Sequence, residues 1–113
     1  MKRKKFTAFL YFREPKMSIE EKRREIDGID KAIVELLNQR AAVAKEISVI
    51  KMVAGFPIRD VRREDAVLRR LTGISEGLIA DQSLGRIYRT IFQESRHAQA
   101  VIREAMMLNQ MPA

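Results

Sequence analysis

The amino-acid sequence predicts an all-α protein in which one long helix is followed by two shorter ones. Apolar residues recur at helical spacing along most of the chain, and the alternation typical of strands is absent. Glycine (5) and proline (3) are scarce among the 113 residues. Apolar residues make up 46% of the chain, which is enough for one small core, so we expect a single domain.

The first helix is expected to run from residue 19 to about residue 54. Ser18 is a suitable N-cap, Glu21 completes a capping box, and Gly55 followed by Pro57 would end the helix. One face of this helix carries an apolar stripe at heptad spacing. The members of the stripe are Ile26, Ile29, Ile33, Leu36, Leu37, Val43, Ala44, Ile47, Ile50 and Ala54.

Two cations interrupt this apolar stripe. Arg40 and Lys51 lie 11 residues apart, which places them on one face of the helix and about 16 Å apart along its axis. Charges that are directed towards a core are costly unless they have a partner, and no acid lies between these two in the stripe. The pattern therefore predicts an anionic ligand.

The second helix is expected to begin after Asp60, which would be its N-cap, and to end at Thr72–Gly73. Glu64 lies four residues after Asp60 and therefore on the same helical face. Residues 74–80 are expected to form a loop, with Leu78 and Ile79 tucked into the core.

The third helix is expected to begin at Asp81 as its cap. Ser95 and Gln99, four residues apart, fall on its apolar face and carry polar groups inward. The apolar residues of that face are Leu84, Ile87, Tyr88, Ile91, Phe92, Ala98, Ile102 and Met106. Two short helices cannot cover the whole stripe of the long one, so we expect a two-fold homodimer with the long helices antiparallel.

The first 16 residues differ in composition from the rest of the chain. Six basic residues against Glu14 give residues 1–16 a charge of +5, while 16 basic and 14 acidic residues give 17–113 only +2 of the total of +7. We expect residues 1–16 to be a loosely ordered basic extension and residues 17–113 to be the functional domain. The apolar run from Phe6 to Phe12 is short for a signal peptide and no cleavage site follows, so a cytoplasmic location is expected.

The composition excludes several kinds of site. The chain has no cysteine and a single histidine, His97, which excludes disulfides, thiolate metal sites and multi-histidine sites. It also has no glycine-rich phosphate loop and no Ser-His-Asp set, and no apolar run approaches the roughly 18 residues of a membrane span. We expect neither a metal nor a cofactor. The candidate site combines cations, hydrogen-bond donors and acids but contains no nucleophile. Such a site is suited to binding a compact polyanion, and any catalysis would act by positioning and electrostatics.

An ordered set of short motifs runs through the chain. They are R-x-x-I-x-x-I-D (Arg23 to Asp30), L-x-x-R (Leu37 to Arg40), Lys51, P-x-R-D-x-x-R-E (Pro57 to Glu64) and E-S-x-x-x-Q (Glu94 to Gln99). This set resembles the AroQ-class, all-helical type II chorismate mutases over about residues 18–105. The resemblance implies an isomerase that rearranges chorismate to prephenate in phenylalanine and tyrosine biosynthesis, without a cofactor. Because no second catalytic domain follows Ala113, we expect it to be monofunctional.

The resemblance also implies roles for the cations and for one amide. Arg23, Arg40 and Lys51 would bind the two carboxylates of chorismate, and Lys51 would also donate to its ether oxygen. Gln99 would be the second donor to that oxygen. Some members of the family carry a glutamate at this position that must be protonated. Because Gln99 is neutral, we expect activity that does not fall sharply from about pH 5 to about pH 8.

Three further residues complete the site that the resemblance implies. Asp60 and Glu64 would hold the ring hydroxyl of the substrate, and Ser95 would help to seat a carboxylate. The residues expected to act in catalysis are Lys51, Gln99, Glu64 and Arg40.

The position of Arg23 can be argued from geometry alone. Arg23 lies 17 residues before Arg40, which is about 25 Å along a straight helix. No ligand with a single ring could touch both residues on one helix. If Arg23 binds substrate, it must do so from the neighbouring chain of an antiparallel dimer.

Taken singly, these residues fit ordinary structural roles. Arg40 or Lys51 could extend along an interface, Asp60 could be only an N-cap, and Ser95 could bond to its own backbone. Two other functions compete with the mutase reading. One is an isochorismate pyruvate lyase on the same scaffold; such lyases are expected to lack the R-D-x-x-R-E segment, which is intact here from Arg59 to Glu64. The other is a non-enzymatic basic module for nucleic acid or membrane, which would depend on residues 1–16. We expect neither of those two partners.

Overall fold

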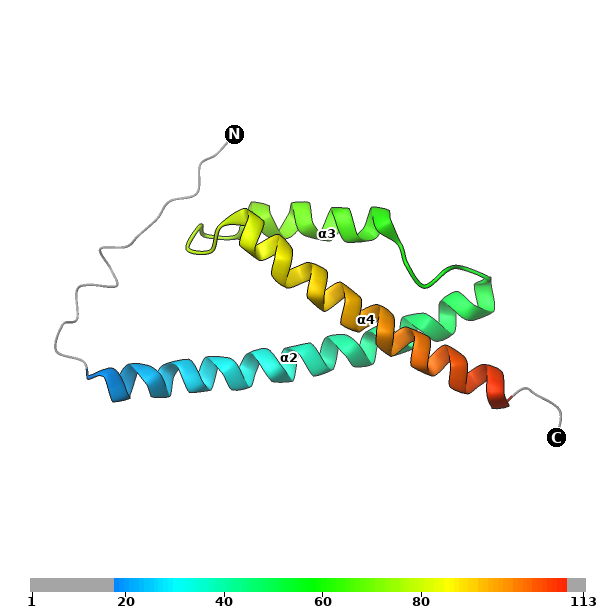
Figure 1. Cartoon of the computed structure of the whole chain (residues 1–113), viewed down its shortest axis with the longest axis horizontal. Coiled ribbons are helices and arrows are strands. Elements are labelled where there is room, and N and C mark those ends of the chain that lie inside the picture. The colour runs from blue at the N-terminus through cyan, green and yellow to red at the C-terminus, as the bar shows by residue number, and fades with distance from the viewer. Residues whose placement is uncertain (1–17, 110–113) are drawn as a thin grey trace.

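The computed structural model describes residues 18–109, and this part of the chain consists of three helices joined by two short connections (Figure 1). Helix α2 spans Ile19–Ala54, α3 spans Val61–Ile74 and α4 spans Asp81–Asn109. The prediction of an all-α chain with one long and two shorter helices is confirmed. The expected basic extension, residues 1–16, lies outside the described residues.

The helix ends follow the predicted capping signals. The Ser18 hydroxyl accepts a hydrogen bond from the Glu21 backbone N–H at 3.2 Å. Gly55 ends α2 in the left-handed conformation, with φ 77°, which a glycine adopts without the steric cost of a Cβ atom. Asp60 caps α3, because its Oδ1 accepts from the Arg63 backbone N–H at 3.0 Å.

Three local expectations were wrong. Helix α3 continues through Gly73 to Ile74. Asp81 is the first residue of α4 and not its cap, because the carbonyl of the preceding Ala80 accepts the hydrogen bond from Leu84 N–H at 2.9 Å. Leu78 and Ile79 are not in the core of the chain but are 50% and 47% exposed. Their loop lies at the end of the α3–α4 hairpin, where no described helix covers it (Figure 1).

Helix α4 is the centre of the arrangement. It crosses α2 and also contacts α3, whereas α2 and α3 make no contact with each other among the described residues (Figure 1). The core lies where the three helices converge, and each helix contributes one buried apolar side chain: Ala44, Val67 and Phe92. Two polar residues, Ser48 and Gln99, are buried at the same crossing.

No other described part of the chain covers the first half of α2. The helix is 36 residues long, or about 54 Å, and every residue from 18 to 39 is exposed. The exposed residues include large apolar ones of the predicted stripe, namely Ile26, Ile29, Ile33, Leu36 and Leu37. A contiguous apolar surface of this length is typical of a site that binds another protein chain.

Candidate active site

The predicted polar residues meet in one cavity where the three helices converge. The cavity has a volume of about 410 Å³, a size suited to a small organic ligand. Its polar and charged lining consists of Arg40, Lys51, Asp60, Arg63, Glu64, Ser95, Arg96 and Gln99. Six of the seven residues that were expected to bind substrate are in this group; the seventh is Arg23.

Arg40 reaches from α2 to α4. Its Nη1 donates a hydrogen bond to the Ser95 hydroxyl, and its guanidinium carbon lies 5.6 Å from the centroid of the Phe92 ring, within the range of a cation–π contact. Both partners are neutral. The contacts orient the guanidinium and leave its positive charge without a carboxylate among the described residues.

Lys51 and Gln99 form a second pair between α2 and α4. The Lys51 ammonium donates to Gln99 Oε1 at 3.3 Å and to the Ile58 carbonyl at 2.6 Å. Because the amide oxygen of Gln99 faces the ammonium, its Nε2 is the end that can donate to a ligand. The result is a cationic and a neutral donor held side by side at the cavity wall.

Ser48 holds the backbone behind Gln99 and was not anticipated from the sequence. This serine is 1% exposed, and its hydroxyl donates to the Gln99 backbone carbonyl at 2.9 Å. The bond fixes α4 against α2 at the point where the amide side chain leaves the helix. A serine within a helix most often bonds to its own backbone, so this contact could not be anticipated from the sequence.

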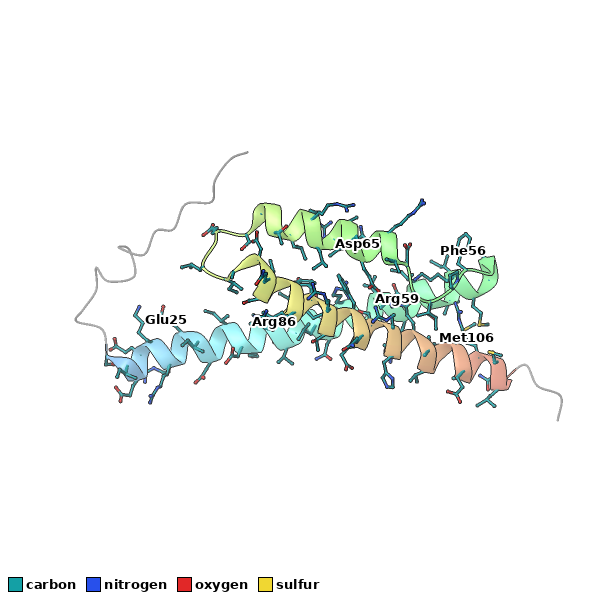
Figure 2. The ribbon with its side chains drawn as sticks, turned by 45° about the horizontal axis from the view of Figure 1, so that its top comes forward. Glu25, Phe56, Arg59, Asp65, Arg86 and Met106 are labelled. Carbon is teal, nitrogen blue, oxygen red and sulfur yellow. The ribbon has the colours of Figure 1, made fainter. Side chains whose placement is uncertain are left out.

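The connection between α2 and α3, which carries Phe56 and Arg59 (Figure 2), is tied to both α2 and α4. Lys51 on α2 binds the Ile58 carbonyl, and Arg103 on α4 donates from Nη2 to the Phe56 carbonyl at 3.0 Å. These two ties place Asp60 at the cavity. Asp60 therefore combines both readings made from the sequence, since it caps α3 and also lines the cavity.

Glu64 lies in the first turn of α3 and is paired with arginines from two directions. Arg96 on α4 donates from Nη1 to Glu64 Oε2, and Arg59 Nε lies 3.8 Å from Oε1. Arg63 and Arg96 also line the cavity, and neither was among the residues predicted to bind substrate. Arg63 could have been predicted as a site residue, since it is one of the specified residues of the P-x-R-D-x-x-R-E motif. Arg96 occupies an unspecified position of the E-S-x-x-x-Q motif, so the motif did not indicate it.

The lining carries an excess of positive charge. Four cations face two carboxylates, Asp60 and Glu64, which leaves two positive charges in excess. A cavity with this balance favours a ligand with two negative charges. Neither cysteine nor histidine is among its lining residues, so the described walls offer no thiolate or imidazole for covalent or acid–base chemistry.

Arg23 stands apart from this cavity. It lies in the exposed first half of α2, about 25 Å from Arg40 along the helix axis. The separate position agrees with the geometric argument that Arg23 could reach a site only on another chain. Within residues 18–109, no three potential metal ligands of the His, Cys, Asp or Glu type lie together, and no helix is long and apolar enough to cross a bilayer.

The fold and the cavity define a class: a small helical protein with a cationic cavity whose described lining contains neither cysteine nor histidine. The chain belongs to the type II chorismate mutase family, whose sequence model matches residues 22–100. The resemblance inferred from the motifs is thereby confirmed.

The relatives that the chain resembles are named as chorismate mutases or as bifunctional proteins that include this activity. The chain is 38% identical over 77 residues to a bifunctional chorismate mutase/prephenate dehydratase of Aquifex aeolicus, covering 65% of this chain and 21% of that protein. A similar bifunctional protein of Neisseria gonorrhoeae is 38% identical over 72 residues, or 64% and 19%. A chorismate mutase of Methanocaldococcus jannaschii is 30% identical over 78 residues, or 68% and 79%. The chain thus spans about a fifth of the bifunctional relatives. No solved structure gives a significant match.

Proposed function

We propose that this chain is a chorismate mutase, an isomerase that converts chorismate to prephenate in aromatic amino-acid biosynthesis. The observation that carries the proposal is the pairing of Lys51 with Gln99 beside the oriented Arg40, in a cavity with two excess positive charges. Family membership and the chorismate mutase names of the relatives support it. The family match at residues 22–100 also supports placing the catalytic domain within residues 17–113.

The reaction needs little chemistry from the protein. In chorismate a carbon–oxygen ether bond breaks while a new carbon–carbon bond forms within the same molecule, so no nucleophile and no proton transfer are required. The barrier falls when the enolpyruvyl side chain is held over the ring and when negative charge on the departing ether oxygen is stabilised. Both tasks suit a rigid site of fixed donors.

The described residues divide these tasks between them. Arg40, oriented by Ser95, binds one carboxylate of the substrate. Lys51 and the amide Nε2 of Gln99 converge on the ether oxygen, where charge develops in the transition state. The carboxylates of Asp60 and Glu64 accept hydrogen bonds, so they match the ring hydroxyl and repel misplaced carboxylates.

The second carboxylate requires a partner chain. We infer a homodimer with antiparallel α2 helices, in which the exposed stripe of residues 19–39 packs on its copy and Arg23 enters the neighbouring cavity. The support is the uncovered apolar surface together with the position of Arg23 far from its own cavity. A cytoplasmic location is proposed on the sequence grounds given above.

The direct test of the proposed function is the loss of chorismate absorbance on addition of the purified protein, with prephenate identified as the product. Isochorismate serves as the control substrate, because release of pyruvate from it would reveal a lyase. Conversion of chorismate alone supports the mutase. Turnover of neither compound would overturn the proposal.

The neutral amide of Gln99 leads to a prediction for the pH profile. The wild-type kcat/KM is expected to vary by less than about threefold from about pH 5 to about pH 8, since an amide does not titrate there. Gln99→Glu is expected to be active only while its carboxyl is protonated and can donate, so its activity falls as the pH rises. Steady-state rates across this range measure both profiles. A flat profile for the variant would show that position 99 does not donate to the substrate.

A further inference from the structure

The contact between Arg96 and Glu64 joins two walls of the cavity. Arg96 comes from α4 and Glu64 from the first turn of α3, and their side chains are only 25% and 18% exposed. Helix α3 contacts α4 alone among the described helices. The ion pair spans this contact, so it ties the Glu64 carboxylate to α4.

Arg96 differs from Arg40 and Lys51 in its partner. Arg40 is bonded to a hydroxyl, and Lys51 to a carbonyl and an amide, so both keep a charge that a ligand carboxylate can neutralise. Arg96 is bonded to a carboxylate already. Its charge is neutralised by Glu64, which argues against Arg96 as an anchor for the substrate's carboxylates.

The contact with Arg96 uses one of the two oxygens of the Glu64 carboxylate. Oε2 accepts from Arg96, while Oε1 has, among the described cations, only Arg59 near it, at 3.8 Å, beyond hydrogen-bond distance. A carboxylate oxygen that lines a cavity can only accept a hydrogen bond. In a ligand with two carboxylates, an ether and one hydroxyl, the hydroxyl is the only group that can donate to it.

Without Arg96 the glutamate would have a different partner. Its side chain has three rotatable bonds, and Arg59, which is 62% exposed, lies on the connection before α3 (Figure 2). An unanchored carboxylate would be free to turn towards Arg59 and solvent. The shielded arginine therefore decides where Oε1 is directed.

Building on the proposed function, we propose that Arg96 is a positioning residue that sets the selectivity of the site for a hydroxyl-bearing substrate. By holding Oε2 of Glu64, it keeps Oε1 in place to accept the hydrogen bond from the ring hydroxyl. Arg96 itself does not touch the reacting atoms.

The test compares two bicyclic dicarboxylate inhibitors of the shape of the transition state, one with the hydroxyl and one without it. Wild type is expected to bind the hydroxylated probe about 10-fold to 100-fold more tightly, the usual range for a hydrogen bond to a charged group. In Arg96→Met this preference is expected to fall below about threefold, while Arg96→Lys keeps part of it. Arg59→Met is the matched control, since it removes the exposed arginine near the same carboxylate and should keep the full preference.

A double-mutant cycle separates positioning from a general structural role. Arg96→Met should add little to the loss of preference already present in Glu64→Gln, because the two residues act as one unit. For chorismate, the fall in kcat/KM should follow the lost preference, and thermal unfolding of each variant reports on folding. Arg96→Lys covers the case in which the methionine variant does not fold.

The possible outcomes are distinct. Wild type that binds neither dicarboxylate and converts no chorismate overturns the proposed function and this inference with it. Wild type that binds both probes, with the preference retained in folded Arg96→Met, overturns the inference alone. Equal weakening of both probes in the methionine and lysine variants would assign Arg96 a structural or carboxylate-binding role and would also overturn it.

Discussion

Lys51→Ala is expected to lower kcat/KM for chorismate by about a thousand-fold. The substitution removes the cationic donor beside Gln99, one of the two excess positive charges of the cavity, and the tie to the Ile58 carbonyl. Fixed donors aimed at developing charge contribute about 100-fold to 1,000-fold each, and here the lost donor also carries a charge. The measurement is the initial rate of chorismate loss at several substrate concentrations.

Lys45→Ala is the matched control for this experiment. Lys45 lies on the same helix but is exposed and does not line the cavity between the three helices. Its replacement should change kcat/KM by less than about twofold, as for most surface substitutions. Activity of a folded Lys51→Ala variant within tenfold of wild type would remove Lys51 from the proposed mechanism.

Arg23→Ala is expected to be the second severe variant, although Arg23 touches nothing in the cavity of its own chain. Loss of a carboxylate anchor should lower kcat/KM by about 100-fold, within the range known for charged contacts that are removed from a shielded site. The effect should appear largely in KM, since the anchor binds the ground state and the transition state alike.

Mixing two inactive variants tests the cross-chain geometry directly. In the proposed dimer a site takes Lys51 from one chain and Arg23 from the other, so a mixed dimer of Arg23→Ala and Lys51→Ala chains would contain one intact site. Equal amounts that are unfolded and refolded together should recover about a quarter of the wild-type activity, because random pairing yields that share of intact sites. The same chains kept apart are the control. No recovery in a mixture shown to form mixed dimers would mean that Arg23 does not act across the interface.

The parts of the structure that were predicted well are those determined by short-range chemistry. The capping residues Ser18, Gly55 and Asp60 act through atoms within a few residues of themselves, so the bounds of α2 and the start of α3 could be read from the sequence. The cavity residues Arg40 and Lys51 were found because charge is unusual in an apolar stripe.

The missed features depend on contacts between distant segments. Ser48 reaches the Gln99 carbonyl, 51 residues away, and Arg96 reaches Glu64, 32 residues away. Neither residue type is unusual for a helix, so nothing in the sequence distinguished them. Leu78 was placed in the core on hydrophobicity alone, which cannot tell whether another element covers a loop.

The bare first half of α2 also bears on how the protein responds to dilution. One chain buries only three apolar side chains among its described residues, too little to hold a domain of this size folded by itself. Separation of the proposed subunits and loss of structure would then be a single event. The melting temperature would rise with total protein concentration, and a cell that makes little of the chain would contain few folded molecules as well as few active ones.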